Sequence, residues 1–161
     1  MEKKKSRQIG HDFQFARFRL GEREFGIEIK KVKEIIRLRE TSRDPSCPPF
    51  LEGFIRLRNI VVPVLDLRKR FSLPFTESEH ARIIIILVEG LIAGLVVDEV
   101  NDVTAGGTQM TDKLSEPEPW NGCVEAVVET QGVTVRIIDP SALLTRDEKS
   151  FLSAPFSEGK G

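Results

Sequence analysis

Two arginines beside an apolar stretch are the first residues in this sequence that could do chemistry. The stretch GFIRLRNIVVPVLDLRKRF, residues 53–71, carries Arg56 and Arg58 just before a hydrophobic run that contains Pro63. An arginine guanidinium presents a rigid fork of donors that fits phosphates, carboxylates and the charged groups of a catalytic site. Three functions therefore compete: phosphate binding, support of a catalytic centre, and docking of another protein.

The other reactive side chains do not form a catalytic or metal-binding pattern. His11 lies near the N-terminus and His80 in the polar segment PFTESEH, without a Ser-x-Gly elbow or an HExxH pair, so both are interpreted as surface residues. Cys47 and Cys123 are 76 positions apart and lack the partners of a zinc site or a disulfide framework. We expect two ordinary buried or half-buried thiols, and no enzyme activity, metal or cofactor.

Phosphate binding, nucleic-acid binding and membrane insertion are also disfavoured. The loop AGGT lacks the Gly-Lys-Ser/Thr ending of a phosphate cradle. The net charge is −1, and no aromatic side chains interleave with the arginines that nucleic acid would need. Those arginines are Arg37, Arg39, Arg43, Arg56 and Arg58. The longest apolar run, residues 83–88, is far below the roughly 20 residues of a membrane span. The basic residues at 3–7 are not followed by an apolar segment, so we expect no signal peptide. We expect a cytoplasmic protein.

The elements that must position the arginines are predicted to be β-strands. FARFRL, residues 15–20, alternates apolar side chains with Arg17 and Arg19, and similar short runs recur between glycine-bearing turns. The fold class is therefore all-β, in one compact body, because 161 residues can bury little more than one core. Pro63 cannot donate a ladder hydrogen bond, which predicts an edge strand or a strand bent at a bulge.

An internal repeat organises these strands. FGIEIKKVKEI, residues 25–35, aligns without gaps on AGLVVDEVNDV, residues 93–103, at a constant offset of 68. The matching pairs are Gly26 and Gly94, Val32 and Val100, and Ile35 and Val103. Each copy is predicted to be a hairpin, a short helical turn, a second hairpin and a capped helix. Asp66 and Asp139 precede short amphipathic stretches, so we interpret them as helix N-caps rather than as acid–base groups.

Several motifs, in order along the chain, resemble those of CheW-type chemotaxis coupling proteins. They are FGIEI, VKEI, PSCPPF, GFIRLRN, PVLDL and GLVVDEV. The resemblance implies two five-stranded SH3-like barrels related by a pseudo-twofold axis, with short helices including one near the C-terminus. The expected organisation is a single domain at 13–151, with half-repeats 13–79 and 80–145 and flexible tails at 1–12 and 152–161.

The resemblance also implies a function. Proteins of this family are non-enzymatic adaptors in chemotaxis signal transduction. They bind the cytoplasmic tip of chemoreceptors (methyl-accepting chemotaxis proteins) and the regulatory domain of the histidine kinase CheA. Such a protein is associated with the inner face of the membrane through receptor arrays. Two alternatives stay open: a CheW-like scaffold of a non-flagellar chemosensory pathway and, from another class, a small-ligand-binding β-barrel. The sequence does not identify the kinase-binding residues.

For the receptor site, the resemblance implies that Arg58 and Glu34 are paired beside a groove, where they shape it or contact the receptor directly. The apolar candidates for gripping a receptor helix, weighed against ordinary core burial, are Val32, Leu57, Val100 and Val103. Asn59 stands where the family has glycine, and we expect it to keep the tight turn because asparagine tolerates positive φ. Arg56 replaces the family's asparagine and is expected to be solvated.

Overall fold

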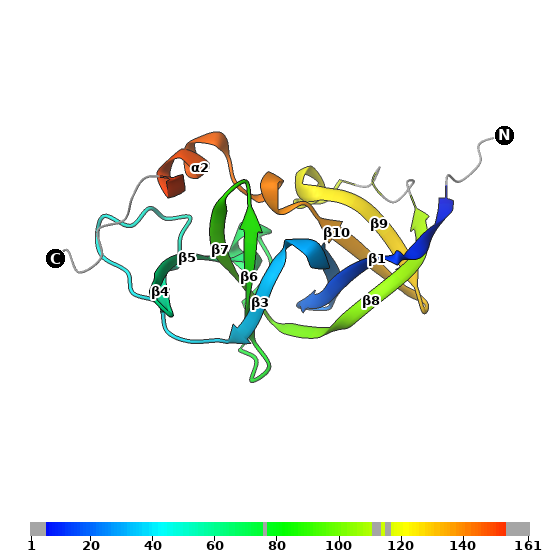
Figure 1. The fold of residues 1–161 in the computed structure, drawn as a ribbon, viewed down its shortest axis with the longest axis horizontal. Coiled ribbons are helices and arrows are strands. Elements are labelled where there is room, and N and C mark those ends of the chain that lie inside the picture. Colours follow the sequence, from blue (N-terminus) through cyan, green and yellow to red (C-terminus); the bar gives the residue numbers. More distant parts are fainter. Residues whose placement is uncertain (1–5, 76, 111–113, 115–116, 154–161) are drawn as a thin grey trace.

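The strands form two five-stranded sheets. The computed structural model describes residues 6–75, 77–110, 114 and 117–153. One sheet is a closed barrel with the strand order β1-β2-β10-β9-β8, which we call barrel A (Figure 1). The other, sheet B, has the order β3-β6-β7-β5-β4. The predicted all-β fold with two five-stranded units and short helices is confirmed.

The elements have the following bounds. Barrel A consists of β1 (Ser6–Leu20), β2 (Arg23–Glu28), β8 (Glu99–Met110), β9 (Val124–Thr130) and β10 (Val133–Ile138). Sheet B consists of β3 (Val32–Arg37), β4 (Gly53–Leu57), β5 (Ile60–Asp66), β6 (Arg82–Val88) and β7 (Leu91–Val97). The helical segments are η1 (Ile29–Lys31), α1 (Leu67–Arg70), η3 (Asn121–Cys123), η4 (Pro140–Leu143) and α2 (Arg146–Ser153).

Each sheet takes strands from both halves of the sequence. β1 and β2 join β8, β9 and β10, whereas β6 and β7 join β3, β4 and β5. The chain crosses from barrel A to sheet B at η1 and returns at Asp98, between β7 and β8. The two repeats are therefore interleaved: each supplies two strands to one sheet and three to the other.

The register of the two parallel strand pairs shows the pseudo-twofold relation. In the β2–β10 pair Gly26 lies opposite Ile137, and in the β5–β7 pair Gly94 lies opposite Val64. Each glycine thus faces the residue two positions before a capping aspartate. Because the same register recurs in both sheets, the repeat found in the sequence is also a repeat of strand pairing.

Close packing inside each sheet explains the two repeat glycines. A Cβ added at Gly26 would lie 2.7 Å from Phe15 Cδ2, and one added at Gly94 would lie 2.8 Å from Ile83 Cγ2. Phe15 and Ile83 are themselves related by the 68-residue offset. Real Cβ atoms do not approach this closely, because packing in protein interiors is already dense. Glycine is therefore needed for the strands to pass these side chains.

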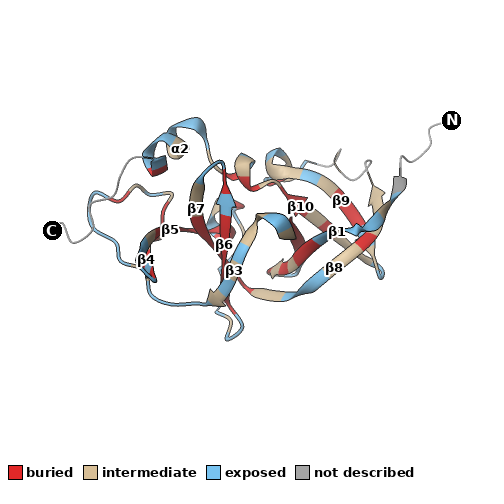
Figure 2. Ribbon diagram, in the orientation of Figure 1, coloured by how far each residue is buried: buried red, intermediate tan, exposed pale blue. Residues whose placement is uncertain are grey.

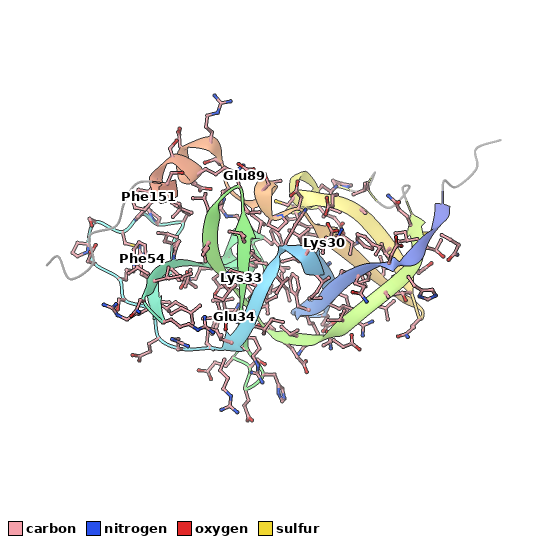
Figure 3. All side chains as sticks on the ribbon, in the orientation of Figure 1. Lys30, Lys33, Glu34, Phe54, Glu89 and Phe151 are labelled. Atoms are coloured by element: carbon pink, nitrogen blue, oxygen red, sulfur yellow. The ribbon has the colours of Figure 1, made fainter. Side chains whose placement is uncertain are left out.

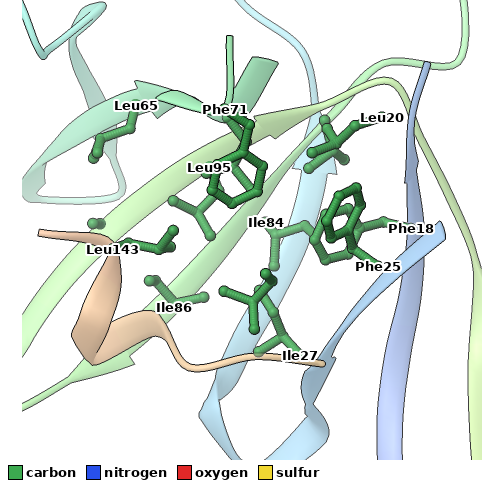
Figure 4. Close-up of a cluster of buried hydrophobic side chains, with 14 of the residues drawn as sticks. Phe18, Leu20, Phe25, Ile27, Leu65, Phe71, Ile84, Ile86, Leu95 and Leu143 are labelled. Carbon is green, nitrogen blue, oxygen red and sulfur yellow. The ribbon is translucent and has the colours of Figure 1, made fainter. Parts of the chain in front are cut away.

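One large core lies between the two sheets and joins them into a single body. Phe18 and Phe25 enter it from barrel A, Ile84 and Ile86 from β6, and Phe71 from the end of α1 (Figure 4). The alternate residues of β6 point into a second core inside sheet B. A strand with a core on each face needs apolar side chains on both, which accounts for the four isoleucines at 83–86. Figure 2 shows the resulting buried strip along β6 and β7.

The structure departs from the sequence prediction at both ends of the domain. Residues 6–12, expected in a flexible tail, belong to β1, where Gln8 pairs with Thr108 and Ile9 with Gly107. At the other end, Leu152 lies in α2 and is only 5% exposed. The remaining tail residues, 1–5 and 154–161, lie outside the described part of the chain. Backbone pairing with β8 supplies the hydrogen bonds that order the N-terminal segment.

β5 is not an edge strand over its whole length, but Pro63 itself pairs on one side only; the alternative of a strand bent at a bulge stays a prediction. β5 lies between β7 and β4, and Pro63 faces Phe54 of β4. Pairing with β7 begins only at Val64. The missing N–H of proline therefore leaves the β5–β7 ladder intact.

Candidate functional site

Arg58 and Glu34 form a two-pronged ion pair on sheet B. Arg58 Nη1 donates to Glu34 Oε2 at 2.6 Å, and Arg58 Nη2 donates to Glu34 Oε1 at 3.0 Å. Glu34 belongs to β3, and Arg58 lies in the two-residue turn between β4 and β5. Because β3 and β4 are at opposite ends of the strand order, the pair spans the seam between them. Figure 3 shows Glu34 on β3, next to Lys33.

The electrostatics of this pair are those of an exposed contact. The Arg58 side chain is 70% exposed and that of Glu34 is 27% exposed. The hydrogen bonds from Arg58 lower the pKa of the Glu34 carboxyl, and the same bonds raise the pKa of Arg58. Water and salt screen such pairs, so they contribute little to folding stability. The consequence of this pair is positional: it holds two opposite charges at one point of the seam.

The turn that carries Arg58 differs from the sequence prediction. Positive φ occurs at Arg58, at 57°, and not at Asn59. The expectation that Asn59 would adopt this conformation is therefore wrong. In two-residue hairpins the first central residue can carry the positive φ that matches the twist of the strands. In the equivalent turn of the second repeat both central residues, Gln131 and Gly132, have positive φ.

Val32 and Val100 occupy equivalent positions at the starts of β3 and β8. Each follows the segment where the chain crosses between the sheets. Each is half-buried and packs against the core that the two sheets share. Opposite Val32 lies Ile86, and opposite Val100 lies Phe18. The two valines therefore lie at the junction of barrel A and sheet B, each with part of its side chain accessible.

Two exposed apolar side chains extend this pair along the same strands. Val103 of β8 is 53% exposed and Ile35 of β3 is 38% exposed. Ile35 was not among the predicted site residues, although the repeat aligns it with Val103. The repeat itself was the signal that could have identified it. With Val32 and Val100, these residues form an apolar set at pseudo-equivalent places, which we call the β3/β8 face.

The remaining predicted contacts differ in environment. Leu57 is 8% exposed and belongs to the core inside sheet B, which favours core burial over direct contact. Arg56 is exposed, and its carbonyl accepts a hydrogen bond from Arg39 Nη1 at 3.0 Å. Leu57 therefore packs β4 onto the interior of sheet B.

Both aspartates act as caps, as predicted. Asp66 Oδ1 accepts from Arg68 N at 2.9 Å, and Asp139 Oδ1 accepts from Ser141 N at 3.1 Å. Sequence analysis missed that the Arg68 side chain is buried between two carboxylates, Asp66 and Asp98. The available signal was Asp98 itself, an acidic residue directly after the apolar run GLVV.

The histidines and cysteines fit their predicted places. His11 and His80 are exposed, Cys47 is buried and Cys123 is half-buried. Burial raises the pKa of both thiols. Within the described ranges, no group of three His, Cys, Asp or Glu side chains is arranged to hold a metal ion. Nor does any helix among those residues have the length and hydrophobicity of a membrane span.

One open pocket of about 370 Å³ lies outside sheet B, beside α1 and α2. It is lined by Pro49, Phe50, Glu52, Asp66, Lys69, Arg70 and Glu148. Its charged groups already have partners: Lys69 Nζ lies 2.7 Å from Glu52 Oε2, and Arg70 Nη2 lies 3.0 Å from Glu148 Oε2. A small ligand would have to displace these pairs, so the pocket gives the ligand-binding alternative no support.

Comparison with known proteins identifies the family. The CheW-like domain family matches residues 14–148. This chain belongs to the CheW family. The match contains the whole of the β3/β8 face as well as Glu34 and Arg58, so the candidate site lies within the CheW domain. The resemblance to a CheW-type chemotaxis coupling protein that the motifs predicted is thereby confirmed.

Individual CheW proteins support the assignment. The chain is 33% identical over 133 residues to the chemotaxis protein CheW of Bacillus subtilis, covering 81% of this chain and 85% of that protein. It is 35% identical over 112 residues to CheW of Klebsiella aerogenes, covering 69% of this chain and 64% of that protein. The crystal structure of the scaffolding protein TtCheW from Thermoanaerobacter tengcongensis superposes with a TM-score of 0.65 at 32% identity, covering 78% of this chain and 88% of that one.

Proposed function

We propose that this protein is a non-enzymatic adaptor that couples the cytoplasmic tip of a chemoreceptor to the regulatory domain of a CheA-type histidine kinase. The observation that carries the proposal is the match of the CheW-like domain family to residues 14–148. Two sheets that share one core make a rigid body, and a rigid body can present separate surfaces to two partners. The protein would work in the cytoplasm, held at the inner face of the membrane through receptor arrays.

The β3/β8 face is the proposed receptor-binding surface. An apolar stripe on a receptor helix would pack against Val32, Ile35, Val100 and Val103, as in other helix-in-groove complexes. The Arg58–Glu34 pair would flank this contact and select the orientation of the helix by charge. Leu57 would act from the core by supporting the strand that leads to Arg58.

The direct test is reconstitution with a receptor cytoplasmic fragment and the kinase regulatory domain. A ternary complex and receptor-dependent control of kinase autophosphorylation are expected. A folded protein that binds neither partner would contradict the proposal. A kinase from a non-flagellar chemosensory pathway, used in parallel, would distinguish this adaptor from the alternative, a CheW-like scaffold of such a pathway.

A substitution at Val100 should separate receptor binding from kinase binding. Val100→Glu should weaken receptor binding by about 1–3 kcal/mol, because a carboxylate would have to lose its water against an apolar helix face. Kinase binding should change less. Val103→Ser, which removes apolar surface without adding charge, is the milder companion. Circular dichroism must show that both variants are folded, since global unfolding would assign Val100 to the core alone.

A further inference from the structure

The chain passes between barrel A and sheet B at two places, and the two crossings are built differently. The first is η1, three residues long, and the second is the single residue Asp98. By the 68-residue offset Asp98 corresponds to Lys30, in the middle of η1. Lys30 is exposed (Figure 3), whereas Asp98 is 1% exposed. Equivalent crossings thus carry opposite charges in opposite environments.

Every polar group of Asp98 has a partner. Its N–H donates to the Arg19 carbonyl at 3.0 Å, and its own carbonyl accepts from Ser78 Oγ at 3.0 Å. In the side chain, Oδ2 accepts from Gly21 N at 2.6 Å and Oδ1 accepts from Arg68 Nη1 at 2.9 Å. Such a fully satisfied buried carboxylate holds its surroundings in one arrangement, because any displacement leaves a charged group unpaired.

The partners of Asp98 come from both sheets of the protein. Arg19 and Gly21 belong to the β1–β2 hairpin of barrel A, whereas Arg68 lies in α1 and Ser78 precedes β6, both on the side of sheet B. Arg68 is fixed in turn by Asp66, to which its Nε and Nη2 donate at 2.9 and 2.8 Å. The contacts of Asp98 therefore tie the two sheets together at the point where the chain crosses between them.

The crossing leads directly into the β3/β8 face. Glu99 follows Asp98 and is held by Arg19, whose Nη2 lies 2.6 Å from Glu99 Oε1. Val100 comes next, and Val103 lies three residues further along β8. The direction in which β8 leaves Asp98 therefore sets where these two valines lie.

We propose that Asp98 is the joint that fixes β8 relative to β3, and so positions Val100 and Val103 against Val32 and Ile35. Only the effect on receptor binding rests on the proposed function; the mechanical role does not. Asp98→Asn tests the joint with little change in shape. An amide has one acceptor oxygen where the carboxylate has two, so its NH₂ group would face either the Gly21 N–H or the Arg68 guanidinium, both of which are donors.

The measurement is the distance across the β3/β8 face. Cys47 and Cys123 are replaced by alanine, spin labels are attached at Ile35→Cys and Val103→Cys, and pulsed EPR gives the distribution of separations. The parent should give one narrow distribution, and Asp98→Asn should roughly double its width, because the two strands then sample several arrangements. Lys30→Gln, at the equivalent crossing, should leave the distribution narrow.

Two further variants keep the result decisive. Thr145→Ala removes the hydroxyl that caps α2, where Glu148 N donates to Thr145 Oγ1 at 3.1 Å, and leaves the partners of Asp98 unchanged. Equal broadening in this variant would mean that lost stability, and not the joint, widens the distribution. If Asp98→Asn does not fold, Ser78→Ala, which removes one hydrogen bond to the Asp98 carbonyl, must broaden the distribution. An unchanged width in the folded Asp98→Asn protein would overturn the proposal.

A binding assay without labels separates the joint from the receptor role. Affinity for the receptor fragment should fall about fivefold or more in Asp98→Asn, the range typical of coupled sites, and should not change in Lys30→Gln. A broader distance distribution with unchanged receptor affinity would support the joint at Asp98 and reject the β3/β8 face as the receptor site. Reduced affinity without broadening would reject the joint.

Discussion

Barrel A and sheet B follow one plan, but backbone pairing closes only barrel A. Its strand β8 runs for 12 residues and pairs with β1 on one side and β9 on the other. The equivalent strand of sheet B, β3, has six residues and pairs with β6. Beyond β3, a single bridge between Ser42 and Phe54 reaches β4. At the seam itself, side chains make the connection, through the Arg58–Glu34 pair.

The difference shows how a duplicated unit can keep its fold and still leave one seam exposed. Backbone closure uses the edge groups of both strands, so nothing is left for a partner. Side-chain closure leaves the seam exposed. Charged side chains there can be substituted without breaking the backbone hydrogen bonds of the sheet. In this protein the Arg58–Glu34 pair lies at the seam of the open sheet.

The two corners capped by Asp66 and Asp139 also differ, in how far they are buried and in what they contact. Asp66 is 6% exposed and shares the buried Arg68 with Asp98. The side chain of Asp139 is 37% exposed, and Lys31 Nζ lies 3.8 Å from its Oδ1. One corner is therefore part of the contact between the sheets, whereas the other caps a helical turn at the surface.

The largest effect is expected at the buried corner. Arg68→Met should lower the free energy of unfolding by about 3–5 kcal/mol, because it leaves two buried carboxylates without a cation. Urea denaturation followed by Trp120 fluorescence measures this. Lys69→Met is the matched control on the same helix: its side chain is 65% exposed, and a loss of about 0–1 kcal/mol is expected. Similar losses in both variants would contradict the distinction between buried and exposed pairs.

The next effect compares the closed and the open sheet. Gly26→Ala and Gly94→Ala should each cost about 1–3 kcal/mol through overpacking, with the larger loss at Gly26. There the added methyl would meet both Phe15 Cδ2 at 2.7 Å and Ile137 Cδ1 at 3.0 Å. At Gly94 one contact, with Ile83, falls below 3.4 Å, and an open sheet can yield. Thermal denaturation ranks the two, and a larger loss at Gly94 would reverse the interpretation.

A smaller loss is expected at the exposed corner. Asp139→Ala removes the acceptor for Ser141 N and should cost about 0.5–2 kcal/mol, the usual range for a helix cap. Asp139→Asn keeps an acceptor and should retain most of this stability. If both variants lose the same amount in urea denaturation, the charge near Lys31, and not the cap, stabilises this corner.

The smallest effect on stability, but a clear one on binding, is expected at the seam. Arg58→Glu should leave the urea midpoint nearly unchanged and weaken receptor binding, since it places two carboxylates side by side. Combining it with Glu34→Arg should recover part of the affinity, which a double-mutant cycle measures as coupling. Additive effects would instead leave Arg58 as an independent contact or an idle charge.

The pH dependence of this pair follows from its lowered pKa. Arg58 holds the pKa of Glu34 below its ordinary value of 4.5, so the contribution of the pair is complete above that value and is lost as the pH falls through the lowered pKa. Receptor affinity should therefore be flat between about pH 6 and pH 8 with respect to this pair. A titration of binding extended below pH 4.5 checks this: affinity should fall there in the parent, and Glu34→Gln should remove that fall.

Local signals in the sequence were enough for several features. Alternation in FARFRL located β1, because one face of a strand needs apolar side chains at every second residue. The repeat predicted equivalent strand pairs, and Asp66 and Asp139 were identified as caps because an N-cap depends on residues two or three positions away. The motif order predicted the CheW family, which the comparison confirmed.

What the sequence did not determine depends on contacts between distant residues. Whether β2 pairs with a strand of its own repeat or of the other is decided by how both halves bury the shared core, so the exchange of strands has no local signal. The same holds for β1 before Phe13, which is ordered by a strand about a hundred positions later, and for Pro63, whose strand is interior. The contact between Arg68 and Asp98 joins residues 30 positions apart. Sequence therefore determined the elements and the family, whereas tertiary packing decided which elements meet. The reason is that the free energy gained by burying apolar surface depends on the whole arrangement of strands and not on any one of them.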